Sequence, residues 1–167
     1  MNTDSLSVPV KTMRRYKLLV GYDGTDYSGW QFLTPQIPTI QAVLQKSLSS
    51  FFDQPIRIVG SGRTDAGVHA EAQVAHFDAP DDERRQKKIA NALQKMTPAS
   101  IAIKGIWLAP SNFHAQMSAT SKTYKYRVWN CSTPSVFARR YSLWLRYPID
   151  VDFLNECCDF IVGKHDF

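Results

Sequence analysis

Residues 55–77 read PIRIVGSGRTDAGVHAEAQVAHF and predict two strands joined by a glycine-rich loop. The strands are expected over Ile56–Val59 and Gln73–Phe77, where β-branched and aromatic residues gather. The loop over 60–70 carries three glycines, a His, and an Arg and an Asp two positions apart. Glycine admits backbone conformations that other residues avoid, so this loop can turn sharply between the strands.

A strand and a helix are predicted on either side of this unit. Upstream, the strand covers 15–22, and a helix follows Thr39 as N-cap, with apolar residues at helical spacing up to Phe52. Downstream, an amphipathic helix is expected over 81–95 and a strand over 101–108. The order β-α-β-β-α-β over residues 14–108 is that of the ferredoxin-like fold, which common RNA-binding domains (RRM domains) also use. The sequence therefore predicts an α+β domain.

The residues outside 14–108 predict a leader and a second unit. Residues 1–13 lack a hydrophobic stretch and are taken as a flexible leader rather than a signal peptide. After a linker over 109–112, residues 121–129 alternate like a strand, and 151–162 predict a helix with Gly163 as its C-cap. One strand and one helix do not close a layer. We therefore expect 112–167 to be the start of an incomplete second α+β domain.

Composition narrows the class of protein only slightly. In the 167 residues, 20 Lys and Arg stand against 15 Asp and Glu, which gives a formal net charge of +5. That excess favours polyanionic partners without identifying one. Three cysteines without a C-x-x-C spacing predict reduced thiols in a cytoplasmic protein. No run of about 20 apolar residues predicts a membrane span, and the histidine spacing predicts no metal site.

The loop over 60–70 admits two interpretations. It lacks the Lys of a phosphate-binding Walker loop and the third Gly of a dinucleotide-binding loop. As a structural turn, it would use Asp65 to bond its own backbone and leave Arg63 as a surface charge. As an active site, it would present Asp65 as a single ionised carboxylate with Arg63 close by, since a nearby Arg favours the charged form.

Four stretches in order resemble the tRNA pseudouridine synthase A family. The loop G-R-T-D-A-G-V-H-A over 62–70 is similar to the catalytic motif of that family. The stretch Y-D-G-T-D-Y-S-G-W-Q over 22–31 resembles its first motif. F-H-A-Q-M-S-A over 113–119 with S-K-T-Y-K-Y over 121–126, and V-G-K-H-D-F over 162–167, resemble two later segments. In the third stretch Gln116 and Met117 stand where Arg and Phe are usual in the family.

The resemblance implies an enzyme and assigns roles to three residues. It would isomerise uridine to pseudouridine at positions 38–40 of the tRNA anticodon arm, without cofactor or metal, as a homodimer. Asp65 would be the nucleophile, Arg63 would pair with Asp65 and assist base flipping, and Tyr124 would stack on the uracil. The family continues beyond His-Asp-Phe, so we expect this chain alone to be weak or inactive.

The remaining basic residues are candidates for RNA contact, and rival functions stay open. Interleaved basic and aromatic residues favour Lys122 and Lys125 beside Tyr124. Further candidates are Arg14, Arg15 and His69, although a structural hydrogen bond is an alternative for His69. A non-catalytic RNA-binding module is the main rival, and it should tolerate Asp65→Asn. A phosphate-ester hydrolase is the weaker rival, because it would need a metal or a second carboxylate.

Overall fold

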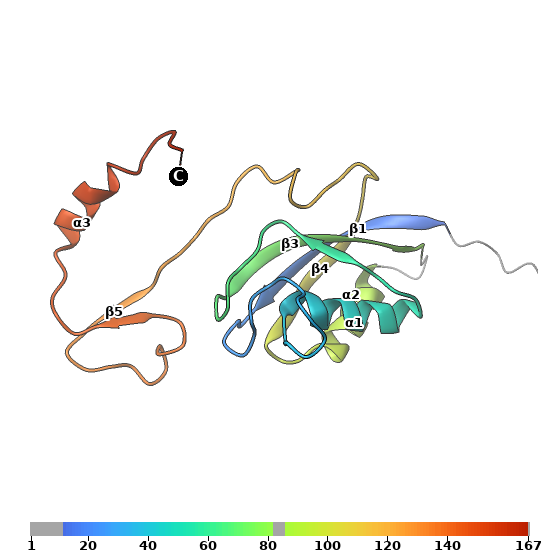
Figure 1. Cartoon of the computed structure of the whole chain (residues 1–167), viewed down its shortest axis with the longest axis horizontal. Coiled ribbons are helices and arrows are strands. Elements are labelled where there is room, and N and C mark those ends of the chain that lie inside the picture. The colour runs from blue at the N-terminus through green and yellow to red at the C-terminus, as the bar shows by residue number, and fades with distance from the viewer. Residues whose placement is uncertain (1–11, 82–85, 167) are drawn as a thin grey trace, which may run out of the picture. The chain divides into compact units, whose positions relative to one another are not determined.

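The computed structural model describes residues 12–81 and 86–166, and they form two compact units of mixed α and β structure. The first unit ends at Ser121 and the second begins at Lys122. Figure 1 labels the helices and strands and colours the chain by residue number. No helix in the described ranges is long and apolar enough to cross a membrane.

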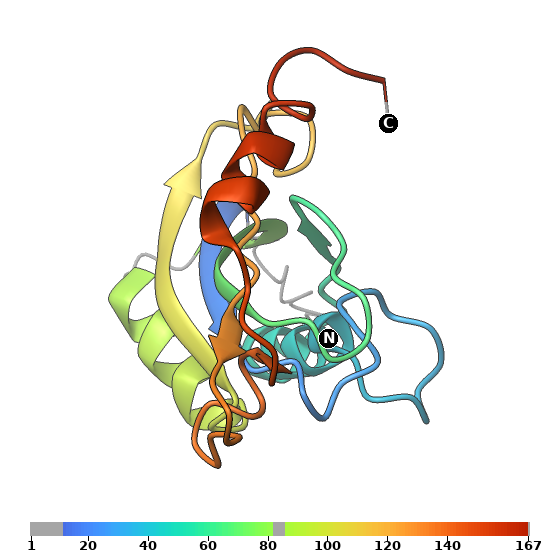
Figure 2. The same ribbon diagram turned by 90° about the vertical axis from the view of Figure 1, so that its left-hand side faces the viewer.

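The first unit is built on one antiparallel sheet. Its strands are β1 (Met13–Tyr22), β2 (Ile58–Gly60), β3 (Ala70–Pro80) and β4 (Ile101–Ala109), in the spatial order β2-β3-β1-β4. β1 pairs with both β3 and β4, and every pair is antiparallel. Figure 2 shows β4 at one edge of this sheet and β2 at the other. The strands predicted around 15–22, 73–77 and 101–108 are confirmed.

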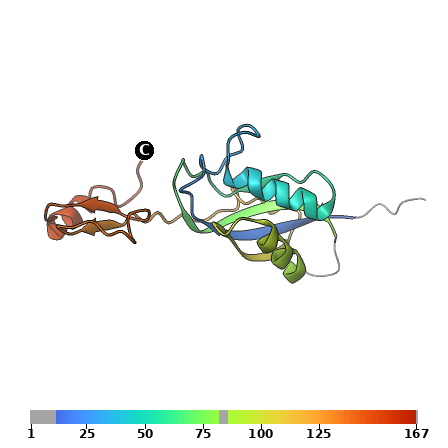
Figure 3. The same ribbon diagram turned by 90° about the horizontal axis from the view of Figure 1, so that it is seen from below.

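Two helices complete the first unit, α1 (Ile40–Phe52) and α2 (Gln86–Met96), and both run alongside the strands (Figure 3). The predicted N-cap is confirmed, since Thr39 has extended backbone and its side chain accepts from the N–H of Ala42. α1 ends where Asp53 adopts φ 52° and donates its N–H to the carbonyl of Ser49. The predicted start of α2 at 81 falls partly on residues 82–85, which lie outside the described ranges.

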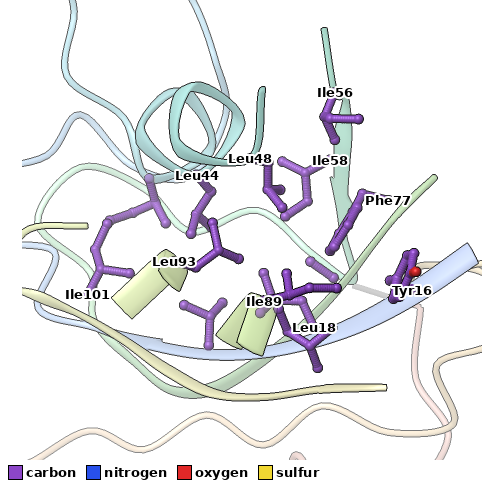
Figure 4. Close-up of a cluster of buried hydrophobic side chains, with 14 of the residues drawn as sticks. Tyr16, Leu18, Leu44, Leu48, Ile56, Ile58, Phe77, Ile89, Leu93 and Ile101 are labelled. Carbon is purple, nitrogen blue, oxygen red and sulfur yellow. The ribbon is translucent and has the colours of Figure 1, made fainter. Parts of the chain in front are cut away.

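One hydrophobic core fills the space between the helices and the sheet (Figure 4). Leu44 and Leu48 from α1 and Ile89 and Leu93 from α2 are fully buried, at the four-residue spacing that defines one helix face. Alternate residues of β1 face the same core, which is the period-two pattern of a half-buried strand. They are Tyr16, Leu18, Val20 and Tyr22. Each such burial stabilises the fold by about 1.5–3 kcal/mol.

The second unit holds β5 (Val128–Asn130), β6 (Leu143–Leu145) and α3 (Val151–Cys158). β5 and β6 pair in parallel, Val128 opposite Leu143. No described residue of this unit is buried, and Phe137, Tyr147 and Phe160 are among its most exposed apolar side chains. The unit therefore has no hydrophobic core within the described residues, in contrast to the first.

Two sequence predictions for the second unit are wrong. The strand expected over 121–129 is reduced to β5, because Tyr124 and Tyr126 have no strand beside them to complete a ladder and stay exposed. The helix expected up to Val162 stops at Cys158 with Asp159 as its C-cap. The next two residues form i→i−3 bonds, from Phe160 to Cys157 and from Ile161 to Cys158, so the helix tightens before Gly163.

Candidate active site

The loop that follows β2 lies against the loop that follows β1. The N–H of Trp30 donates to the carbonyl of Thr64 at 2.9 Å, and the N–H of Gly67 donates to the carbonyl of Tyr27 at 3.1 Å. Both bonds join residues more than thirty positions apart. The backbone around Asp65 is therefore fixed by the 23–30 loop and not only by its own turn.

Glycine is required where these two loops meet. Gly29 has φ 84°, and a Cβ there would overlap the carbonyl oxygen of Thr64. A Cβ on Gly24 would overlap the carbonyl of Val68. Gly67 also has a positive φ, 78°, but it faces open space. Gly24 and Gly29 thus allow the backbones to touch, while Gly67 only serves the turn.

Asp65 and Arg63 point into solvent from this fixed loop. Both are exposed. Within the described ranges, neither side chain has a hydrogen-bond or ion-pair partner, so the Arg63–Asp65 pair that the resemblance implies is not formed here. The backbone carbonyl of Asp65 accepts from the N–H of Val68 at 3.1 Å, which closes the turn. The carboxylate itself is available to a ligand.

Polar side chains beneath the loop connect it to the sheet. The Tyr22 hydroxyl lies 2.9 Å from Oγ1 of Thr64 and 3.4 Å from Oε1 of Gln73. Nε2 of Gln73 donates to the carbonyl of Gly62 at 3.0 Å. Burial raises the pKa of the Tyr22 phenol, and the bond with Thr64 opposes this in part. The phenol is therefore neutral near pH 7 and serves as a hydrogen-bonding group.

His69 closes the far end of the loop. Its Nδ1 lies 3.1 Å from the backbone N of Gly24 and 3.0 Å from Oδ1 of Asp23. Without a proton, Nδ1 accepts from Gly24; with a proton, it donates to Asp23. Either way the ring joins the two loops, which is the structural alternative to the predicted RNA contact. The RNA contact itself stays a prediction.

Arg14 and Arg15, predicted as RNA contacts, are both engaged in ion pairs. Arg14 pairs with Asp81 at 3.0 Å. Arg15 forms two parallel bonds with Asp78, at 2.8 and 2.7 Å, and donates to the carbonyls of Ser111 and Phe113. These bonds lower the pKa of Asp78. Arg15 therefore ties the segment after β4 to β1 and β3, and an RNA phosphate would have to compete with these bonds.

The same segment reaches His76 on β3. The N–H of Ala115 donates to Nδ1 of His76 at 3.1 Å, and the rings of His76 and His114 lie 4.8 Å apart between centroids. Both His76 and Ala115 are buried. Burial first, and then the charges of Arg15 and His114, lower the pKa of His76. The neutral imidazole is thus the form that holds this segment.

Stability is expected to fall as pH drops below about 6.5, the ordinary pKa of histidine. Because the folded pKa of His76 is lowered, its contribution is complete above the unfolded pKa and is lost as pH falls through the folded value. Urea unfolding of the chain between pH 8 and pH 5 measures this slope. His76→Asn keeps an acceptor near Nδ1 but does not titrate, so its stability should depend less on pH. Equal slopes for both proteins would contradict the assignment.

Tyr124, Lys122 and Lys125 belong to the second unit. Tyr124 is 70% exposed, and both lysines are exposed as well. An exposed aromatic ring with two lysines close to it in the sequence is typical of a surface that stacks on a base and contacts phosphates. The stacking of Tyr124 on a uracil stays a prediction.

Sequence reasoning missed the supporting groups of the loop. Tyr22 and Trp30 both lie in the 22–31 stretch that resembles the first motif of the family, and both are buried in the core. The roles of Thr64 and Gln73 had no signal in the local pattern. The glycines at 24 and 29 were a usable signal, because glycines in an aromatic-rich loop indicate close approach of another backbone.

The sequence of the chain matches a known protein family. A model of the tRNA pseudouridine synthase family matches residues 18–116, more than half of the chain and including the Asp65 loop. The chain therefore belongs to the tRNA pseudouridine synthase family.

Individual relatives carry the name tRNA pseudouridine synthase A. One from Bdellovibrio bacteriovorus is 40% identical over 156 residues, covering 92% of this chain and 60% of the relative. One from Lactococcus lactis subsp. lactis is 41% identical over 158 residues, covering 93% and 61%. One from Xylella fastidiosa is 37% identical over 157 residues, covering 93% and 60%. The chain thus spans about 60% of the length of these relatives.

Proposed function

We propose that this chain carries the nucleophile-bearing part of a cytoplasmic tRNA pseudouridine synthase. Its substrate would be uridine at positions 38–40 of the tRNA anticodon stem-loop, and the complete enzyme would act as a homodimer without cofactor or metal. The observation that carries the proposal is the exposed carboxylate of Asp65 on a loop that is fixed by the neighbouring 23–30 loop. The names of the relatives support the substrate and the reaction class.

The reaction exchanges one bond for another. Uridine gives up its N–C glycosidic bond, and the same base forms a C–C bond to the sugar. The ring carbon that forms this bond loses a proton, and the ring nitrogen that was released gains one. The base must first leave the stack, which costs a few kcal/mol. Arg63 would occupy the gap or hold a phosphate, and Tyr124 would replace the lost stacking, worth roughly 1–3 kcal/mol per base. Asp65 would then attack the base or the sugar, or start elimination at the sugar; the three routes stay open.

The architecture supports the same proposal at a coarser level. The sheet order β2-β3-β1-β4 and its antiparallel pairing support a ferredoxin-like description of residues 14–108. We propose residues 112–167 as the start of a second domain of the pseudouridine synthase fold. Its exposed apolar side chains support the further proposal that this domain is incomplete on its own.

The test is pseudouridine formation in an anticodon stem-loop transcript, measured by nucleoside chromatography. The Lactococcus lactis relative serves as the reference. We expect this chain to bind the transcript and to convert it at least ~100-fold more slowly, because a carboxylate open to bulk water gains little electrostatic stabilisation of the transition state. Equal rates would contradict the weak activity of the chain. If the chain neither binds nor converts the transcript, that result would contradict the tRNA function.

A further inference from the structure

The position of the Asp65 carboxylate depends on the backbone beneath it. Its side chain has no hydrogen-bond or ion-pair partner within the described ranges, so no side-chain contact holds it in place. The residue immediately before it, Thr64, is held twice. Its carbonyl accepts from Trp30, and its hydroxyl bonds to Tyr22 at 2.9 Å. Whatever fixes Thr64 therefore fixes the start of the Asp65 side chain.

The Tyr22 hydroxyl links two side chains beneath the loop. It lies 2.9 Å from Oγ1 of Thr64, where either oxygen can be the donor. It also lies 3.4 Å from Oε1 of Gln73, which can only accept. The amide of Gln73 in turn donates to the carbonyl of Gly62. Gly62 and Thr64, on either side of Arg63, are thus joined through Tyr22 and Gln73.

Tyr22 is a rigid support for this chain of bonds. It is 5% exposed, and its ring lies 6.1 Å from that of Trp30 between centroids. Its backbone pairs with Ala70 of β3 and Ile101 of β4. Its ring is therefore held at the end of β1, a central strand of the sheet, and beside the ring of Trp30. The loop over 62–65 is therefore held in place by hydrogen bonds to residues of the sheet.

We propose that Tyr22 is a positioning residue, whose hydroxyl sets the place of the Asp65 carboxylate through Thr64. The expected effect on catalysis rests on the proposed function. The effect of Tyr22 on the position of the loop does not. Catalytic groups need to be held within about 0.5 Å, and a misplacement of 1 Å can cost ~100-fold in rate. Loss of the Tyr22 hydroxyl is therefore expected to slow the reaction without weakening RNA binding.

The experiment uses the whole chain with Tyr22→Phe and with Tyr27→Phe as matched control. Tyr27 also loses a hydroxyl bond, to Ser100 at 2.8 Å, but not one to the Asp65 loop. Hydrogen exchange is followed at the amides of Trp30 and Val68, which donate to the carbonyls of Thr64 and Asp65. We expect Tyr22→Phe to speed exchange there by ~10-fold and Tyr27→Phe to leave it unchanged.

A second pair of variants tests the hydroxyl of Thr64. Thr64→Val removes it at equal shape, and Thr64→Ser keeps it. The rate of conversion of the stem-loop is measured with protein in excess. The dissociation constant of the complex between protein and stem-loop is measured as well. We expect Tyr22→Phe and Thr64→Val to slow conversion by ~10- to 100-fold with unchanged affinity, and Thr64→Ser to restore the rate.

The outcomes separate the positioning role from the proposed function. Unchanged exchange in Tyr22→Phe and Thr64→Val overturns the positioning role, whatever the chain does to RNA. Faster exchange in these two variants, with Thr64→Ser exchanging at the wild-type rate, supports the positioning role even where the wild-type chain neither binds nor converts the stem-loop. That result would count against the proposed function alone. Faster exchange together with an unchanged conversion rate overturns the catalytic consequence.

Discussion

Asp65→Asn is expected to abolish pseudouridine formation and to leave binding of the anticodon stem-loop intact. The substitution keeps the size of the side chain and removes its charge, so a nucleophilic carboxylate becomes an inert amide. Loss of a nucleophile costs on the order of 10⁴-fold or more in rate in well-studied enzymes. Because Asp65 has no side-chain partner in the described structure, its replacement removes no bond from the fold. The melting temperature should therefore stay unchanged.

Asp26→Asn is the matched control for this experiment. Asp26 is an exposed carboxylate in the neighbouring loop, so its replacement changes the net charge of the chain by the same amount. Both proteins are compared for conversion with protein in excess and for affinity. A variant Asp65→Asn that converts at the wild-type rate would contradict the nucleophile. Tighter binding by Asp65→Asn, with no conversion by the wild-type chain, would favour the non-catalytic RNA-binding module.

The first unit could be predicted closely because its signals are local. The alternation of buried residues in β1 and the four-residue spacing in α1 each follow from one layer of helices on one sheet. The capping role of Thr39 is equally local, since its side chain reaches the N–H of a residue three positions on. The pairing order of the strands was an expectation from their sequence order, not from any one residue.

The second unit resisted prediction because a strand depends on its partner. Residues 121–127 alternate as a strand should, yet the strand that forms, β5, covers only 128–130, paired with β6. Alternation predicts which side of a sheet each residue would face, but it does not predict whether a partner strand is present. The end of α3 at Cys158 is set by the hydrogen bonds of its last turn. Gly163, four positions beyond the C-cap Asp159, therefore did not predict where the helix ends.

The site was predicted in its reactive residues and missed in its supports. Asp65 and Arg63 stand in a recognisable motif, whereas the bond from Tyr22 to Thr64 spans 42 positions. Nothing in the local pattern around Thr64 indicates a partner at that separation. Arg15 was predicted as an RNA contact, and the structure shows it in an internal ion pair with Asp78. A basic residue near the start of a strand can serve either purpose. Long-range polar contacts of this kind are found only from the fold.

Gly29→Ala is expected to destabilise the first unit by about 3 kcal/mol, and Gly67→Ala by only about 1 kcal/mol. Both glycines have positive φ, 84° and 78°, so both variants carry the strain of a left-handed alanine. They differ in surroundings: a Cβ at 29 overlaps the Thr64 carbonyl, while a Cβ at 67 meets nothing within 4 Å. The difference between the variants therefore measures the contact between the two loops.

The contact has a second consequence, because the Thr64 carbonyl also accepts from Trp30. An alanine at 29 must push the two backbones apart, which breaks this bond and shifts Asp65, whereas an alanine at 67 leaves both in place. Urea unfolding gives the stabilities, and hydrogen exchange at the Trp30 amide reports the bond. Equal losses of stability would mean that the loops separate at no cost. In that case the fixed position of Asp65 would have to come from the Tyr22 side alone.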